Sequence, residues 1–135
     1  MPIIVNSIFP PLPTLRRCRE LGAAVAAAIG GSTSRRRVAL LATGGISHTV
    51  GAPGMERNDP DFDAAFLGAL AEGDLERACS HSDRVLDAAG NGTHEVRNWV
   101  AVASAMQPAR PTVVTAIAFA PGWDTGVHQL LWETA

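Results

Sequence analysis

The sequence predicts an α/β fold, with a layered sheet flanked by helices, as a single domain over residues 1–135. The length and the 47% hydrophobic content suffice for one buried core. Short β-branched runs alternate with stretches of helical spacing, which is typical of layered α/β structures. No internal repeat, low-complexity segment or linker divides the chain.

The first predicted strand covers residues 2–9 (PIIVNSIF), and Pro10 and Pro11 end it. A helix is then expected to start at Thr14. Its apolar residues recur at steps of three and four positions from Leu15 to Ile29, which gives one apolar face. Gly30 and Gly31 end this helix.

A second strand is predicted over residues 37–43 (RVALLAT). Its continuous apolar character is typical of a strand inside a sheet that is covered on both faces. It leads into Gly44-Gly45-Ile46-Ser47-His48, and the chain up to Pro60 is then rich in Gly, Pro and Asn. We expect a long irregular loop there, in the position where functional residues are often found.

The second half is predicted to contain several helices and one further strand. Asp59 or Asp61 caps the first helix, Ser82 or Asp83 caps the third, and Thr93 caps the last. The apolar tail is expected to pack rather than fray. The elements expected are helices over 61–70, 83–90 and 94–106, a short turn or helix over 74–79, and a strand over 112–120. Three strands are few for so many helices, so we expect exposed sheet edges unless other strands pair with them.

Composition excludes several classes of protein. The net charge of −2 argues against a nucleic-acid-binding surface, and the absence of tyrosine excludes phenol-based catalysis. Cys18 and Cys79 form no close pair, which argues against a disulfide scaffold and a structural zinc site. No apolar run reaches the roughly 20 residues of a membrane span. The first residues have no secretory-signal pattern, so we expect a soluble cytoplasmic domain.

His48 is the first candidate for chemistry. It follows a predicted strand and two glycines that allow the backbone to approach a ligand, which suits a group that transfers protons. The spacing alone leaves a second interpretation open, in which His48 only caps the strand end. Ser47 is a poor candidate for a nucleophile activated by His48, because neighbouring side chains in an extended segment point to opposite sides.

Glu95 is the second candidate. It lies in the first turn of a predicted helix, where the helix dipole favours a carboxylate, and an ordinary first-turn glutamate is the simpler interpretation. His94 lies about 100° round the helix from Glu95, so the two are not expected to bind one metal. We expect His81 and His128 at the surface, and Arg97 either paired with a carboxylate or facing solvent.

Taken together, these motifs resemble a known family. Residues 42–48 (ATGGISH), 51–53 (GAP) and 89–99 (AGNGTHEVRNW) are similar to the catalytic B subunit of class III extradiol ring-cleavage dioxygenases, which include protocatechuate 4,5-dioxygenase. The resemblance extends from the first residues to about Met106 and corresponds to the C-terminal half of that subunit. Glu95 follows His48 by 47 residues, and both match the family's functional positions.

The resemblance implies a mononuclear non-haem Fe(II) site of the 2-His-1-carboxylate type, acting on a catechol and O2. Glu95 would be the carboxylate ligand. His48 would be the acid/base that takes a proton from a catechol hydroxyl and returns it later. Residues 51–58 would shape the substrate pocket, and Thr125 and Gly126 would also line it.

The same resemblance implies that the metal site is incomplete in this chain. Family members take both histidine ligands from their first half, and His81, His94 and His128 do not match those positions. We therefore expect Fe(II) only when a companion N-terminal segment or dioxygenase subunit completes the ligands. The alternative is a non-catalytic domain of the same fold, used for binding or for subunit association, with exposed edges covered by self-association into a homo-oligomer. A nucleotide-binding domain is disfavoured, because GGISHTVG lacks the G-x-G-x-x-G pattern.

Overall fold

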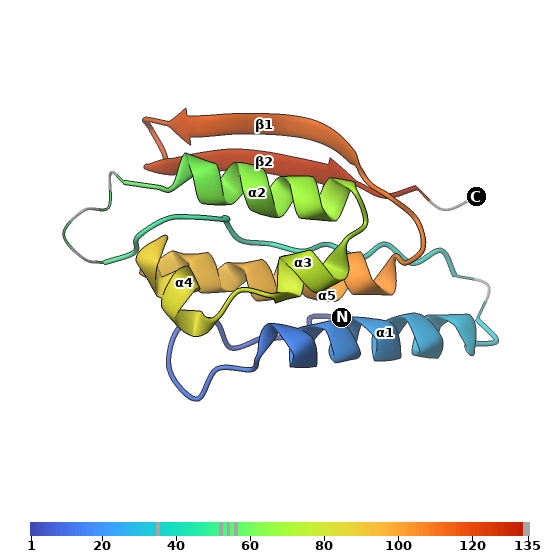
Figure 1. Cartoon of the computed structure of the whole chain (residues 1–135). Coiled ribbons are helices and arrows are strands. Elements are labelled where there is room, and N and C mark those ends of the chain that lie inside the picture. The colour runs from blue at the N-terminus through green and yellow to red at the C-terminus, as the bar shows by residue number, and fades with distance from the viewer. Residues whose placement is uncertain (35, 52, 54, 56, 134–135) are drawn as a thin grey trace.

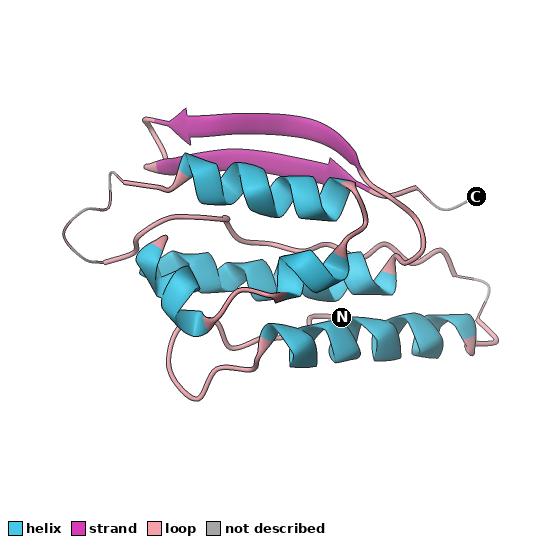
Figure 2. Ribbon diagram, viewed as in Figure 1, coloured by secondary structure: helices cyan, strands magenta, loops and turns pink. Residues whose placement is uncertain are grey.

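The computed structural model describes residues 1–34, 36–51, 53, 55 and 57–133. It confirms the predicted α/β class, with helices packed beside a two-stranded antiparallel sheet (Figures 1 and 2). The elements are α1 (Leu15–Gly30), α2 (Pro60–Ala71), α3 (Leu75–Cys79), α4 (Asp83–Ala88), the 3-10 helix η1 (Asn91–Glu95), α5 (Val96–Ala105), β1 (Thr112–Ala120) and β2 (Thr125–Leu131).

Side-chain caps start α1 and α2, as predicted. The Thr14 side chain accepts a hydrogen bond from the Arg17 amide and starts α1, and Asp59 does the same for the Phe62 amide in α2. The single helix expected over 94–106 is instead η1 followed by α5. The predicted cap at Thr93 is wrong, because Thr93 lies inside η1 and Glu95 is the N-cap residue of α5. The strand expected over 112–120 is β1, and it pairs with β2 in the tail, where no strand was predicted.

The strands predicted over 2–9 and 37–43 are wrong for the described chain. Residues 37–42 make no hydrogen bond to the other described residues, and Leu41 is 85% exposed. A strand exists only when a neighbour pairs with it, and the described chain places no strand beside either segment. Both segments therefore remain loops in spite of their β-type composition, as the loop colour in Figure 2 shows.

The core lies between the helices. Helices α1 and α5 pack against each other, and the buried apolar side chains include Leu15, Cys18, Phe66, Leu70, Leu86, Val96 and Val100. Figure 1 shows α1 at one side of the molecule and the sheet at the other, with the segment before His48 running between them. Part of the expected apolar face of α1 is uncovered, since Ile29 is exposed.

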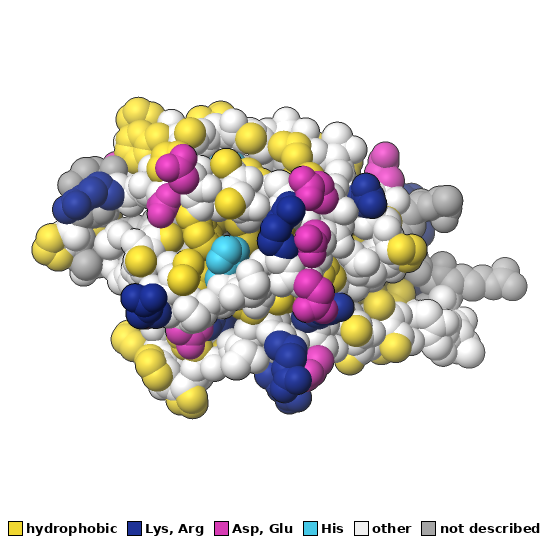
Figure 3. Space-filling model, in the orientation of Figure 1, with side chains coloured by type: hydrophobic (Ala, Val, Ile, Leu, Met, Phe, Trp, Pro, Cys, Tyr) yellow, Lys and Arg dark blue, Asp and Glu magenta, His cyan; other side chains and the backbone are white. Residues whose placement is uncertain are grey.

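The described surface carries charges of both signs. Arg77 pairs with Glu72 at 2.8 Å, and Arg19 pairs with Glu76. Figure 3 shows acidic and basic side chains interspersed on one face, without a large patch of either sign. No helix among the described residues is long and apolar enough to cross a membrane.

Candidate functional site

The structure brings His48 and Glu95 together, although they are far apart in the sequence. His48 Nε2 lies 3.5 Å from Glu95 Oε2. The His48 side chain is 13% exposed and the Glu95 side chain is 34% exposed, so the pair lies at the edge of the core and can be reached from outside. His48 Nδ1 is buried and has no hydrogen-bond partner in the described structure. A carboxylate and an imidazole at this separation can bind a polar group and move a proton to or from it.

Hydrogen bonds join the two motifs that carry these residues. The Gly45 amide donates to Glu95 Oε2 at 2.8 Å, and the Gly92 amide donates to the His48 carbonyl at 3.0 Å. Trp99 Nε1 donates to the Gly44 carbonyl at 3.0 Å. Residues 43–50 and 91–99 thus form one unit, which fixes the relative position of His48 and Glu95.

Two glycines make this close approach sterically allowed. A Cβ on Gly44 would lie 2.8 Å from Glu95 Cβ, and Gly44 also has a φ of +113°, which disfavours other residues. A Cβ on Gly92 would lie 2.7 Å from His48 Cε1 and closer still to two other ring atoms. The imidazole therefore lies directly on the Gly92 backbone.

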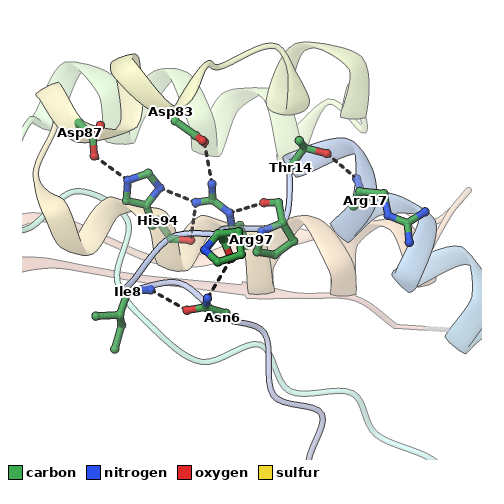
Figure 4. Close-up of polar contacts among 10 residues, drawn as sticks. Asn6, Ile8, Thr14, Arg17, Asp83, Asp87, His94 and Arg97 are labelled. Carbon is green, nitrogen blue, oxygen red and sulfur yellow. Dashed lines mark hydrogen bonds and ion pairs between the residues drawn. The ribbon is translucent and has the colours of Figure 1, made fainter.

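A polar network anchors η1, the element that carries Glu95, and it joins the buried Arg97 and His94 side chains to the exposed carboxylates of Asp83 and Asp87 (Figure 4). The Arg97 side chain is fully buried and donates to Asp83 Oδ1 at 2.7 Å and to the Pro13 carbonyl at 2.6 Å. It also donates to His94 Nδ1, so His94 carries its proton on Nε2 and donates to Asp87 Oδ1 at 2.7 Å. Of the two alternatives for Arg97, pairing with a carboxylate is therefore confirmed.

Asp63 and His128 form a second, buried pair beside Ser47, the residue before His48. Asp63 Oδ1 accepts a hydrogen bond from the Ser47 amide at 2.8 Å, and Asp63 Oδ2 lies 3.8 Å from His128 Nε2. Burial raises the pKa of Asp63, and the hydrogen bonds from Ser47 and the nearby His128 partly oppose that shift. Burial lowers the pKa of His128, against the effect of Asp63.

The expected surface position of His128 is wrong, because its side chain is only 3% exposed. His128 lies on β2, and the alternation of that strand turns it toward α2. His81 is half-buried against the Phe62 ring, with the two ring centroids 5.0 Å apart, and burial lowers its pKa. Thr125 contacts the Ser47 carbonyl through its hydroxyl, at 3.3 Å. The predicted pocket loop over 51–58 includes residues 52, 54 and 56, which lie outside the described residues.

The described residues do not complete a metal site by themselves. Among them, no group of three or more His, Cys, Asp or Glu side chains is placed to hold a metal ion. His94 is bound to Arg97 and Asp87, and His128 faces Asp63. Among the described residues, Glu95 is the one ligand-type side chain beside His48, so they supply the carboxylate of a 2-His-1-carboxylate site but not its two histidines.

A cavity adjoins this unit. It has a volume of about 710 Å³ and is lined by residues 38–42 and 44, by Trp99 and other residues of α1 and α5, and by residues 128–132. Its lining is mostly apolar, and its size is in the range of pockets that bind small organic molecules. A second cavity of about 530 Å³ is lined by residues 1–5 and 39–43 and by α1 and α5.

Comparison with known proteins gives one matching family and several relatives. A family model described as the catalytic LigB subunit of aromatic ring-opening dioxygenase matches residues 1–127. A 2,3-dihydroxyphenylpropionate/2,3-dihydroxicinnamic acid 1,2-dioxygenase 1 from Dechloromonas aromatica is 30% identical over 82% of this chain and 49% of its own length. The corresponding dioxygenase from Mycolicibacterium vanbaalenii is 30% identical over 78% of this chain and 47% of its own length.

A shorter match is closer in sequence. Gallate dioxygenase from Pseudomonas putida is 41% identical over 70 residues, which cover 52% of this chain and 21% of that protein. The chain spans about half the length of the dihydroxyphenylpropionate relatives that it matches.

Proposed function

Because this chain belongs to the family of the catalytic LigB subunit of aromatic ring-opening dioxygenase, we propose that it supplies part of an extradiol ring-cleaving site. The substrates would be O2 and an aromatic compound with two adjacent hydroxyl groups. The contact of His48 with Glu95, at 3.5 Å, is the observation that carries this proposal. The names of the relatives, which act on dihydroxyphenylpropionate and gallate, support the substrate class.

In this proposal the two side chains have different roles. His48 accepts a proton from a catechol hydroxyl and later returns it, since its ring is held beside a carboxylate and is still partly accessible. Glu95 is the carboxylate ligand of Fe(II), which would supply the redox chemistry. The Gly45 amide orients that carboxylate through its bond to Oε2.

The two remaining iron ligands would come from outside these 135 residues. Support comes from the donor set, in which Glu95 is the one suitable ligand next to His48 among the described residues. A companion segment or dioxygenase subunit with two histidines would complete the site. The apolar cavities beside residues 38–42 offer a surface for it, because the backbone of this segment is unpaired and Val38 is 57% exposed.

A non-catalytic domain of the same fold is the alternative, with self-association over these edges. The joined motifs around His48 and Glu95 favour the catalytic proposal, since an association module needs no imidazole on a glycine beside a carboxylate. Protocatechuate stays within the proposed substrate class, and the cytoplasmic location and the single domain stay predictions.

The test is reconstitution with ferrous iron in air. The chain is assayed alone and together with a companion carrying the rest of the family domain, using 2,3-dihydroxyphenylpropionate and gallate as probes. We expect the yellow ring-opened product only from the mixture, and its loss in Glu95→Ala and His48→Ala. His81→Ala is the matched control, because His81 contacts Phe62 rather than Glu95. Inactivity of every mixture, or equal activity of Glu95→Ala and wild type, would overturn the proposal.

A further inference from the structure

Every backbone and side-chain polar atom of Ser47, the residue before His48, has a partner. Its amide donates to Asp63 Oδ1 at 2.8 Å, and its carbonyl accepts from Thr125 Oγ1 at 3.3 Å. Its hydroxyl donates to the Asp59 carbonyl at 3.1 Å and accepts from the Asp59 amide at 2.7 Å. Ser47 is fully buried. The backbone that leads into His48 is therefore held by residues at the start of α2 and at the start of β2.

Asp63 is the charged member of this arrangement. It lies in the first turn of α2, where the helix dipole favours a carboxylate, and it is only 2% exposed. A buried carboxylate needs compensation from donors around it. Oδ1 accepts a hydrogen bond from the Ser47 amide, whereas Oδ2 has no hydrogen-bond partner among the described residues and faces His128.

β2 is shaped to bring His128 against Asp63. A Cβ on Gly126 would lie 3.0 Å from Asp63 Oδ2 and 3.2 Å from the Ala118 carbonyl oxygen, and it would overlap the His128 ring. Only a glycine at that position leaves room for the imidazole. The His128 and Asp63 side chains are thus packed together in a space that both elements close off from solvent.

We propose that Asp63 is a positioning residue for His48, which acts through the Ser47 amide, and that His128 holds Asp63 in place. Neither Asp63 nor His128 forms a hydrogen bond or an ion pair with the His48 ring, so their effect passes through the backbone. The ring lies on Gly92 beside Glu95, and loss of the bond to the Ser47 amide would loosen the backbone that places it there. The effect of Asp63 on catalysis rests on the function proposed above. The positioning of the His48 ring by Asp63 does not depend on that function.

The test uses the full chain and two nuclear magnetic resonance readouts. One is the hydrogen-exchange rate of the Ser47 amide, and the other is the nuclear Overhauser effect between the His48 ring and the Gly92 Hα atoms. Asp63→Ala is expected to raise the exchange rate about tenfold or more, as the loss of a hydrogen bond to a charged group implies, and to weaken the Overhauser effect. Asp63→Asn keeps an acceptor oxygen for the Ser47 amide and is expected to restore both readouts.

Asp61→Ala is the matched control, because Asp61 lies in the same helical turn and is exposed. It should leave both readouts unchanged. Unchanged readouts in a folded Asp63→Ala chain, or equal changes in Asp61→Ala, would overturn the proposal. If Asp63→Ala does not fold, His128→Leu takes its place: a several-fold faster Ser47 exchange supports the proposal, and an unchanged rate contradicts it.

An assembled, active enzyme adds a further readout. Asp63→Ala should lower kcat and leave KM close to the wild-type value, and Asp63→Asn should recover most of kcat. An Asp63→Ala enzyme with wild-type kcat would contradict the proposal. If no assembly cleaves a ring, the proposed function fails while the resonance measurements still decide the positioning role.

Discussion

Gly92→Ala is the most informative single substitution at the candidate site. The new Cβ would lie 2.7 Å from His48 Cε1 and closer to Nε2 and Cδ2. Carbon atoms that are not bonded to each other settle at about 3.5–4.0 Å, so the ring must retreat by about 1 Å. The backbone can accept alanine there, because Gly92 has no positive φ. The substitution therefore moves the imidazole without removing a polar group.

A displacement of that size is costly for catalysis and modest for folding. Misplacing a reacting group by about 1 Å can lower the rate about 100-fold, which is the loss of kcat we expect in the assembled enzyme. Overpacking should lower the free energy of unfolding by only about 1–3 kcal/mol. Product formation is followed by absorbance, and stability is followed by urea denaturation of the chain alone.

Gly68→Ala is the control for this experiment, because a Cβ at Gly68 in α2 meets no other atom within 4 Å. It should leave kcat unchanged and stabilise the helix by about 0.5–1 kcal/mol. A Gly92→Ala enzyme with wild-type kcat would refute the reasoning, since the ring would then not need its present place on Gly92.

Three further predictions concern stability and reactivity. Arg97→Ala should lower the free energy of unfolding by about 3 kcal/mol, because it leaves a cavity in place of a fully buried side chain and removes the donors to His94 and the Pro13 carbonyl. Arg97→Lys should not restore it, because one ammonium cannot replace the bonds to Asp83, His94 and Pro13; urea denaturation measures both. Burial lowers the pKa of His81 below its ordinary value of 6.5, so the unfolded chain takes up a proton there first and the free energy of unfolding should decline as the pH falls below 6.5. The decline should be smaller in His81→Leu, and an equal decline in both proteins would contradict this. Burial raises the pKa of the Cys79 thiol to about 11 from 9.0. At pH 8 this thiol should therefore react with a disulfide reagent about 100-fold more slowly than an ordinary cysteine. A normal rate would argue against the buried position.

The sequence predicts the elements that depend on local signals. Thr14 and Asp59 cap helices where side-chain type and position indicate, and the β-branched run over 112–120 forms β1. The runs over 2–9 and 37–43 have the same composition, yet they remain loops. Strand formation depends on a partner, and residues 37–42 have no hydrogen-bond partner among the described residues.

The part of the candidate site that lies in local sequence motifs could also be predicted. His48 and Glu95 are proposed from motifs that resemble a family, and the structure places the two side chains 3.5 Å apart. The Asp63–His128 pair could not be found this way, because its members lie on α2 and β2 and no local pattern links them. A glycine two residues before a histidine on an apolar strand, as in Gly126 and His128, is the one signal for it, and that signal is weak.

Iron retention in the assembled enzyme tests the central claim most directly. Bound iron and kcat are measured together for wild type, Glu95→Gln and His48→Asn, each combined with the companion that supplies the missing ligands. We predict that Glu95→Gln loses both iron and turnover, whereas His48→Asn keeps its iron and loses turnover. An assembly in which Glu95→Gln holds iron as tightly as wild type, or in which His48→Asn turns over normally, would contradict the roles assigned to these two side chains.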